Sequence, residues 1–350
     1  MKRWYNFFRN WEQWPAHIFY LPLVPFWLLY CLRSRNVWFF TASKPTLTFG
    51  GFEGEGKGEM YRQLPPNTFP RTIYIEPSLP SSGLLAEIAA AAFGWPVAVK
   101  PDVGMKGLLF RKITTPEQLK HFHRQCPTTY IIQEWIDYPV EVGVFYCRMP
   151  NEAKGEITGF TLKEPVMVTG DGVSTVGALI ERHPRTLKRI AYLKIQHEKY
   201  WSEVLADGAV FQVTFTGNRT GGGRLYNLKN QIDDQLTAIF DDISAYNQSF
   251  FWGRYDIKCA DVNDLKNRKN YSILEFNGAG AGPNHIYHCG LTLSEAYREV
   301  LKHWNLLYRI SRYNHQCQGA RYWSFMEGWR FLRQAKKHFK LLYQMDKQIQ

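Results

Sequence analysis

Cysteines are few in this chain of 350 residues, and nothing in their spacing suggests a function. The six cysteines are scattered, without a Cys-x-x-Cys pair or the spacing of a metal finger. This distribution argues against a disulfide framework and against a zinc-finger fold. No internal repeat is apparent either, so a repeat architecture is not expected. A reduced, cytosolic chain is the simplest interpretation.

Long apolar runs are also lacking. The run near the N-terminus covers residues 18–32 and is interrupted by Pro22 and Pro25, whereas a spanning helix needs roughly 20 apolar residues. No small-residue cleavage site follows it, so a secretory signal is a poor match. Its flanks are aromatic and basic, the basic residues being Lys2, Arg3, Arg9, Arg33 and Arg35. We therefore expect a segment at a membrane interface or, as the alternative, an aromatic arm that packs on the body.

Acidic residues are outnumbered by basic ones. The chain has 43 Lys and Arg against 31 Asp and Glu, a net charge of +12. This excess favours phosphate-bearing partners, which include nucleotides, nucleic acid and anionic lipid. No nucleic-acid-binding module is recognisable, so a nucleic-acid partner is not expected. With 45% hydrophobic and 21% charged residues, the chain has the composition of a folded protein.

Glycine-rich and then proline-rich sequence from Thr46 to Arg71 marks a loop that leads into a new structural unit. Strands and helices alternate after it, with several strands adjacent, which indicates an α+β domain. We expect a membrane-interfacial N-terminal segment, an N-lobe, a C-lobe that carries an insert, and a basic helical tail. Their ranges are 1–45, 46–130, 131–295 with the insert 174–250, and 296–350. The tail is either a packed helix with a solvated face or a basic amphipathic helix on a membrane.

Four polar residues stand out in the predicted hairpin of residues 253–280. Side chains two apart on a strand point to the same face, so Arg254 and Asp256 share one side of the first strand. Glu275 and Asn277 share one side of the second strand in the same way. If the two faces coincide, a cation, two carboxylates and an amide converge, and such oxygen ligands suit Mg²⁺ with its bound phosphates.

A second group of residues suggests a nucleotide site. Lys100 ends the apolar strand "PVAVK" and precedes a loop that contains Gly104 and Gly107. A lysine at a strand end can contact a phosphate, and the amides of a glycine-bearing loop can cover it. The stretch "QEWIDYPVEVGVF" adds a hinge for the adenine edge, with Glu141 available for ribose hydroxyls.

Together these motifs resemble the ATP-grasp ligases, a family that includes D-alanine–D-alanine ligase, glutathione synthetase and the ATP-dependent part of cyanophycin synthetase. The resemblance covers residues 57–288, about two thirds of the chain. It implies that Lys57 and Lys100 bind nucleotide phosphate, that Glu134 lies at the adenine hinge and that Glu141 holds the ribose. The family's "R-x-D" and "E-x-N" pairs, which carry the catalytic arginine and the magnesium ligands, match Arg254, Asp256, Glu275 and Asn277.

The resemblance also implies a fold and a reaction. The fold is α+β, with two α+β lobes clasping ATP, here with an aromatic N-terminal arm and a helical basic tail. The reaction joins a carboxylate to an amine through an acyl phosphate, with ATP and two Mg²⁺ ions, or Mn²⁺ in their place. Lys163, in "FTLKEP", is placed at the γ-phosphate, and the amides of "NGAGAG", around Gly280, at the developing oxyanion.

The acceptor substrate is less defined. The resemblance implies a further domain before the ATP-grasp fold, and we expect the aromatic arm to stand in its place here. Arg219 and Arg224 are candidates for binding a substrate carboxylate, because guanidinium offers bidentate geometry, or they are solvated loop residues. The expected partners are small-molecule or lipid-linked carboxylate and amine substrates, and an anionic membrane surface.

Two other functions remain open: a non-catalytic, membrane-associated ATP-binding module and a kinase-like phosphotransferase. The expected location is the cytoplasm, peripherally on the inner face of the membrane.

Overall fold

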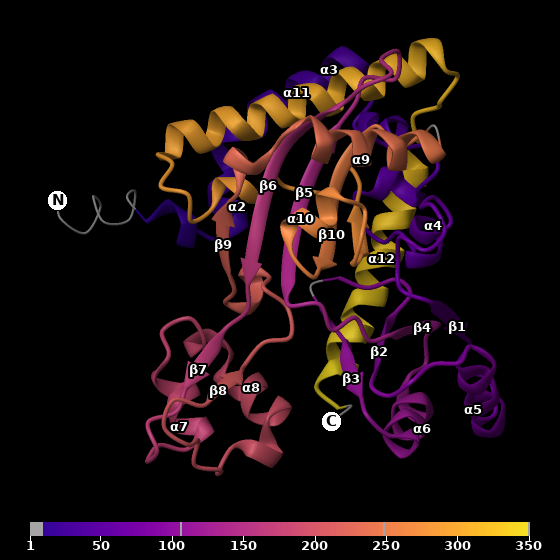
Figure 1. The fold of residues 1–350 in the computed structure, drawn as a ribbon. Helices are drawn as coiled ribbons and strands as arrows, with labels where there is room; N and C mark the ends of the chain where they lie inside the picture. Colours follow the sequence, from indigo (N-terminus) through magenta and orange to yellow (C-terminus); the bar gives the residue numbers. More distant parts are fainter. Residues whose placement is uncertain (1–9, 106, 248, 349–350) are drawn as a thin grey trace.

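The computed structural model describes residues 10–105, 107–247 and 249–348, and it has a large body with two smaller units attached (Figure 1). The strands are β1 (Thr72–Ile75), β2 (Val97–Pro101), β3 (Arg111–Ile113), β4 (Tyr130–Glu134), β5 (Val140–Cys147), β6 (Glu156–Glu164), β7 (Met167–Thr169), β8 (Val210–Gln212), β9 (Arg224–Asn227), β10 (Trp252–Cys259) and β11 (Tyr271–Asn277). The α-helices are α2 (Ala16–Tyr20), α3 (Val24–Ser34), α4 (Lys57–Tyr61), α5 (Ser81–Ala90), α6 (Pro116–Gln125), α7 (Val176–Arg182), α8 (Ile190–Gln196), α9 (Asp234–Tyr246), α10 (Val262–Lys266), α11 (Leu293–Cys317) and α12 (Phe325–Asp346). The expected α+β class is confirmed.

The N-lobe is built on a four-stranded antiparallel sheet in the order β1-β4-β2-β3. Helices α5 and α6 pack on it through Leu84, Leu119 and Phe122. Strand β4 ends at Glu134, so this lobe extends a few residues beyond the expected boundary at residue 130. The reason is that β4 pairs with β1 and β2 and therefore belongs wholly to this sheet.

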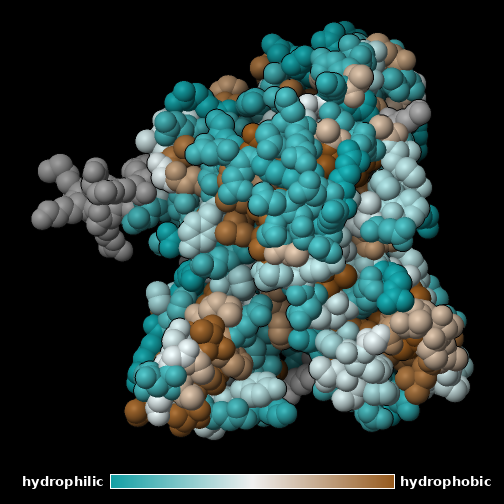
Figure 2. Space-filling model, in the orientation of Figure 1, coloured by the Kyte–Doolittle hydropathy of each residue, from teal (hydrophilic) through white to brown (hydrophobic). Residues whose placement is uncertain are grey.

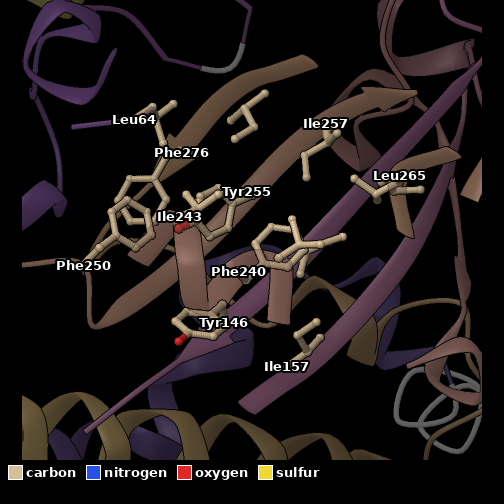
Figure 3. Packing of buried hydrophobic residues seen from close by; sticks show 14 of the residues in the cluster. Leu64, Tyr146, Ile157, Phe240, Ile243, Phe250, Tyr255, Ile257, Leu265 and Phe276 are labelled. Atoms are coloured by element: carbon tan, nitrogen blue, oxygen red, sulfur yellow. The ribbon is translucent and has the colours of Figure 1, made fainter. Parts of the chain in front are cut away.

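The C-lobe contains a five-stranded antiparallel sheet in the order β11-β10-β5-β6-β9. Alternate side chains of β5 enter two different cores, as a strand buried on both faces requires. Val144 and Tyr146 pack with Phe240 of α9 and Tyr255 of β10 in the core drawn in Figure 3. Phe145 points the other way, into the core formed with α11 and the N-terminal arm. The polar residues of β10 lie on that second face.

The bounds of the insert differ from the expected 174–250, because β7 (Met167–Thr169) belongs to it and α9 does not. Its own core, which includes Val166, Ile180, Leu193 and Val213, belongs to β7, α7, α8 and β8. Helix α9 lies within the expected range of 174–250 but packs on the C-lobe sheet, because its apolar side chains continue that sheet's core. Figure 2 shows a hollow between the insert and the N-lobe on the face seen there.

The N-terminal arm is docked on the body over residues 10–23. Trp11, Phe19 and Leu23 are buried in a core with Ile286 and Val300. Residues 10–23 therefore pack on the body, and whether the arm also meets a membrane stays a prediction. By length and composition alone, the helical stretch Ala16–Ser34 would also suffice to cross a membrane. The basic residues Lys2, Arg3 and Arg9 lie outside the described residues.

The two long C-terminal helices pack on different parts of the protein. Helix α11 runs along the outer edge of the C-lobe beside α3 (Figure 1). Helix α12 crosses from that region to the N-lobe, where Phe339 and Leu342 enter the lobe's core. Ser324 caps the start of α12: its hydroxyl accepts from the amide of Glu327, and the carboxylate of Glu327 accepts from the amide of Ser324, which completes a capping box. The C-terminal half of α12 is thus packed on the N-lobe.

Candidate nucleotide and metal site

The four hairpin residues converge as their spacing predicts. Strands β10 and β11 are antiparallel neighbours, with Arg254 opposite Asn277 and Asp256 opposite Glu275. Directly opposed residues in such a pair have Cβ atoms about 4.5–5.5 Å apart. One guanidinium, two carboxylates and one amide therefore share a small patch on one face of the sheet.

The carboxylate of Asp256 is shared by two cations. Its Oδ1 lies 3.0 Å from Nε of Arg254 and 3.0 Å from Nζ of Lys163. Burial would raise the pKa of Asp256, but Arg254 and Lys163 outweigh burial and lower the pKa to about 2. Burial likewise opposes the charge of Lys163, yet Asp256 and Glu141 raise its pKa. Gly143 lies opposite Asp256 on β5, and the absence of a side chain there leaves room for this contact.

Two further lysines approach strand β11 from the N-lobe side. Nζ of Lys57 lies 4.0 Å from Oε1 of Glu275, and Nζ of Lys100 lies 3.3 Å from the carbonyl oxygen of Leu274. Burial lowers the pKa of both lysines, and Glu275 opposes that effect. Tyr61 donates to the same carbonyl of Leu274 at 2.7 Å. Positive charge from the N-lobe thus faces the carboxylates of the C-lobe.

The glycine loop follows Lys100 and is held by the C-terminal helix. Gly107 adopts φ +75°, a left-handed conformation that favours glycine, and a side chain at this position would meet only open space. Nε2 of His338 lies 2.8 Å from the carbonyl of Val103, and the carboxylate of Asp346 accepts from the amide of Leu109. A side chain at Gly104 would touch Pro101. Helix α12 therefore positions the loop expected to cover phosphate.

The two expected hinge glutamates have partners within the protein. Glu134 ends β4, where both of its oxygens accept bonds from Arg71. Among the described residues no contact joins it to Asp256, Lys163 and Arg254, which we call the Asp256 cluster. Glu141 is buried within that cluster, with one oxygen 3.1 Å from Lys163 and the other accepting from the amide of Gly217. Contact of Glu141 with a ribose would require one of these bonds to be released.

Three consecutive amides of the segment "NGAGAG" already donate hydrogen bonds to the backbone. Its amides at Ala279 and Gly280 donate to the carbonyls of Gly50 and Gly51, and the amide of Ala281 donates to Gly278. A side chain at Gly280 would collide with the carbonyl of Phe52. These residues pack two backbone segments against each other, so the expected role of their amides is corrected to a structural one.

The expected substrate arginines occupy different surroundings. The guanidinium of Arg219 stacks on Tyr287, 4.0 Å from its ring centroid, and donates to the carbonyl of Glu12 in the arm. Arg224 is exposed on β9, and no contact between it and the Asp256 cluster is found in the described part of the chain. Arg219 and Arg254 both lower the pKa of the Tyr20 hydroxyl, so both arginines act electrostatically on this group.

Sequence reasoning missed two residues of the site. Burial raises the pKa of Tyr20 to about 12, against the effect of the two arginines. A side chain at Gly282, whose carbonyl accepts from Arg254, would come close to the Tyr20 hydroxyl. Burial and the neighbouring Glu275 raise the pKa of Glu55 to about 7, while Lys57 opposes them. Glu55 was visible only as part of a glycine-rich loop, and Tyr20 only as part of the apolar arm.

A cluster of His285, Glu299 and His303 lies beneath the loop that follows β11. Nδ1 of His303 lies 2.8 Å from the backbone carbonyl of Glu299, and its Nε2 lies 2.9 Å from the hydroxyl of Thr158. His285 lies 3.2 Å from the Glu299 carboxylate. Because both ring nitrogens of His303 have hydrogen-bond partners, this cluster is accounted for as a bonded network that fixes the loop.

Comparison with known proteins gives distant structural matches. No family model matches the sequence, and no curated protein does. The solved structures found include a bifunctional glutathione synthetase from Pasteurella multocida, with 14% identity over 70% of this chain and 35% of that one, at a TM-score of 0.37. They also include a D-alanine–D-alanine ligase from Bacillus anthracis, with 11% identity over 73% and 68% of the two chains at 0.41. A third is the VanG D-Ala:D-Ser ligase from Enterococcus faecalis, with 13% identity over 69% and 57% at 0.38.

These structures are similar to the chain only in part. The chain spans about a third of the length of the glutathione synthetase and 57% of VanG. Two of these names, glutathione synthetase and D-alanine–D-alanine ligase, also belong to the ligases that the sequence motifs resemble. At these TM-scores the overlap in shape is loose, and the case for a function rests on the geometry of the site.

Proposed function

We propose that this chain is an ATP-dependent ligase that joins a carboxylate to an amine. The observation that carries the proposal is the meeting of Lys57 and Lys100, from the N-lobe side, with Glu275 and its cross-strand partner Asp256 on the C-lobe sheet. Buried lysines suit phosphate, and opposed carboxylates suit a cation bound to phosphate. Neither the lysines nor the opposed carboxylates would be expected here in a protein that binds no phosphate.

The donor set fits a divalent cation. Asp256 and Glu275 offer carboxylate oxygens on adjacent strands. The Glu275 side chain is 39% exposed, and among the described residues its ion-pair partner is Lys57, at 4.0 Å. Among the described residues the Asn277 amide nitrogen is buried without a hydrogen-bond partner, so no bond of this nitrogen fixes the orientation of the amide, whose oxygen would face the cation. Mg²⁺, or Mn²⁺ in its place, would be held by these three residues. When bound, it would offset the charge of the nucleotide phosphates.

The chain's own residues then perform two tasks. Lys57 and Lys100 would bind the phosphates of ATP and orient the terminal one toward the carboxylate substrate. Arg254, at the end of the cluster, would stabilise the charge that develops as a carboxylate oxygen bonds to the γ-phosphorus and the bond to ADP breaks. The resulting acyl phosphate is a good acylating agent, so an amine attacks its carbonyl carbon, releasing phosphate and losing a proton.

The first test is calorimetric binding of a non-hydrolysable ATP analogue with and without Mg²⁺. We expect magnesium-dependent binding to the intact protein and its loss in the variant Glu275→Gln/Asn277→Ala. Glu156→Gln is a matched control, because Glu156 is exposed at the far end of β6 in the same sheet. Absence of binding to the folded protein would refute the nucleotide site.

Substrate classes are the second test. A screen of small-molecule and lipid-linked acid and amine pairs for ADP release should give turnover that requires both members of a pair. Release that requires the acid alone would identify a kinase-like phosphotransferase instead. Nucleotide binding without turnover for any pair would favour the non-catalytic module.

A further inference from the structure

Helix α3 is apolar on all sides, but the protein covers only one of them. Trp27, Tyr30 and Cys31 point inward, where Tyr30 stacks on Tyr308 of α11. Leucines dominate the opposite side, and Leu32 there is 74% exposed. A helix that is hydrophobic all round is normally enclosed by protein or lipid. We therefore expect protein or lipid to cover the exposed side of α3.

Exposed apolar side chains continue from α3 to the start of α12. Trp38 joins the two elements, because its ring stacks on Phe325 and its indole N–H donates to the carbonyl of Phe325. Phe325 in turn stacks on Trp329. We call this surface the α3 face. Its exposed apolar residues are Leu21, Val24, Phe26, Leu28, Leu29, Leu32, Val37, Phe325, Met326 and Trp329.

The charges on α3 and on the sequence around it are of one sign. The sequence from residue 13 to residue 52 contains no aspartate or glutamate, and its Arg and Lys residues are Arg33, Arg35 and Lys44. Arg33 and Arg35 are exposed at the end of α3. On α12, Arg330 is exposed next to Trp329, whereas the nearby Glu327 is paired with Arg321. The face thus combines apolar side chains with uncompensated cations.

We propose that the α3 face docks on an anionic lipid surface, with α3 lying in the plane of the interface. Apolar side chains enter the acyl boundary while arginines meet anionic headgroups, and tryptophan favours the headgroup level. A second copy of the chain fits less well, because α3 would bring arginines against arginines with no acidic residue to pair with them. This surface is separate from the nucleotide site and does not depend on its function.

The arm determines how the face is presented. Phe19 and Leu23 are buried in the body and hold the N-terminal end of α3, while Tyr30 and Cys31 hold its inner side. These contacts keep α3 along the outer edge of the molecule, beside α11 (Figure 1). Docking therefore needs no unfolding of the arm, and the helix lies on a membrane rather than crossing it.

The experiment is co-sedimentation of the full-length protein with vesicles of phosphatidylcholine and phosphatidylglycerol, and with vesicles of phosphatidylcholine alone. We expect binding to the anionic vesicles that weakens in high salt. The variant Leu28→Glu/Leu32→Glu should bind at least about 10-fold more weakly, since it places two carboxylates on the apolar face. Leu187→Glu, which changes a leucine that is 60% exposed on the insert, is the matched control and should bind like the wild type.

Each of the other outcomes overturns the proposal. Wild-type protein that stays in the supernatant, or a double variant that binds as well as wild type, would show that the α3 face does not bind lipid. Light scattering on the eluting protein tests the second copy: a dimer that Leu28→Glu/Leu32→Glu converts to a monomer would make the face a protein interface. Unchanged circular dichroism and unchanged binding of the ATP analogue show that the variant is folded, and they separate this result from the test of the nucleotide site.

Discussion

Nζ of Lys163 lies 3.0 Å from Oδ1 of Asp256, so two residues expected to serve the γ-phosphate and the metal are bonded to each other. Arg254 shares the same carboxylate oxygen. The positive charges of Lys163 and Arg254 are balanced by the carboxylates of Asp256 and Glu141. A cation at Asp256 therefore has to share this carboxylate with Lys163 and Arg254, whereas Glu275 is comparatively free.

Removing the Lys163 cation should cost stability. In Lys163→Met, Glu141 and Asp256 remain buried after losing a shared partner, and breaking a buried pair in this way typically destabilises by about 3–5 kcal/mol. Urea unfolding would measure the loss. Lys302→Met is the control, because its pair with Glu156 is more than half exposed and should contribute less than about 1 kcal/mol. Equal stability of the two variants would contradict a buried triad.

Nucleotide affinity should depend on the protonation of Lys57 and Lys100. Burial lowers the pKa of each below the ordinary value of 10.5, so raising the pH toward that value removes positive charge and weakens binding of the ATP analogue. Lys100→Met should lower the affinity about 10- to 100-fold at neutral pH, as expected for a lost charged hydrogen bond.

Lys100→Arg is the informative control for the pH effect. Arginine stays protonated throughout this range, so the variant should show a weaker decline of affinity from neutral to alkaline pH. Calorimetric titrations at several pH values would show this. An identical decline in both proteins would place the titrating group elsewhere.

Arg254 should matter for turnover rather than for nucleotide binding. Arg254→Ala leaves Asp256 paired with Lys163, so the fold and the binding of the ATP analogue should persist. Turnover should fall by about 10²–10³, the usual effect of losing one group that stabilises transition-state charge. ADP release with a substrate pair found in the screen is the measurement. Normal turnover in the variant would remove Arg254 from the mechanism.

The local geometry of the hairpin could be predicted from the sequence because a strand has a period of two. This rule placed Arg254 with Asp256 and Glu275 with Asn277, and the register of β10 and β11 makes the two faces coincide. Lys163 joins the cluster because β6 pairs with β5, which places Lys163 opposite Glu141. The residue types of the two strands do not reveal this register.

Other features depended on contacts between distant segments. The arm packs on the loop after β11 through Tyr287, and the amides of "NGAGAG" bond to Gly50 and Gly51, more than 200 residues earlier in the chain. Composition showed that the arm is aromatic and that the loop is rich in glycine. It could not show that each meets its partner, because tertiary packing decides where such segments go.

Glu55 should make the stability of the protein depend on pH. Its pKa is raised from 4.5 to about 7, chiefly by burial and then by Glu275, so the folded protein favours the protonated carboxyl. The associated stability is present below pH 4.5 and is lost as the pH rises through 7, by up to about 3 kcal/mol for a shift of this size. Glu55→Gln, which imitates the protonated form, should match the wild type at pH 5 and exceed it at pH 8. Urea unfolding of both proteins across this range measures the difference, and a constant difference at all pH values would show that Glu55 ionises as it does in the unfolded chain.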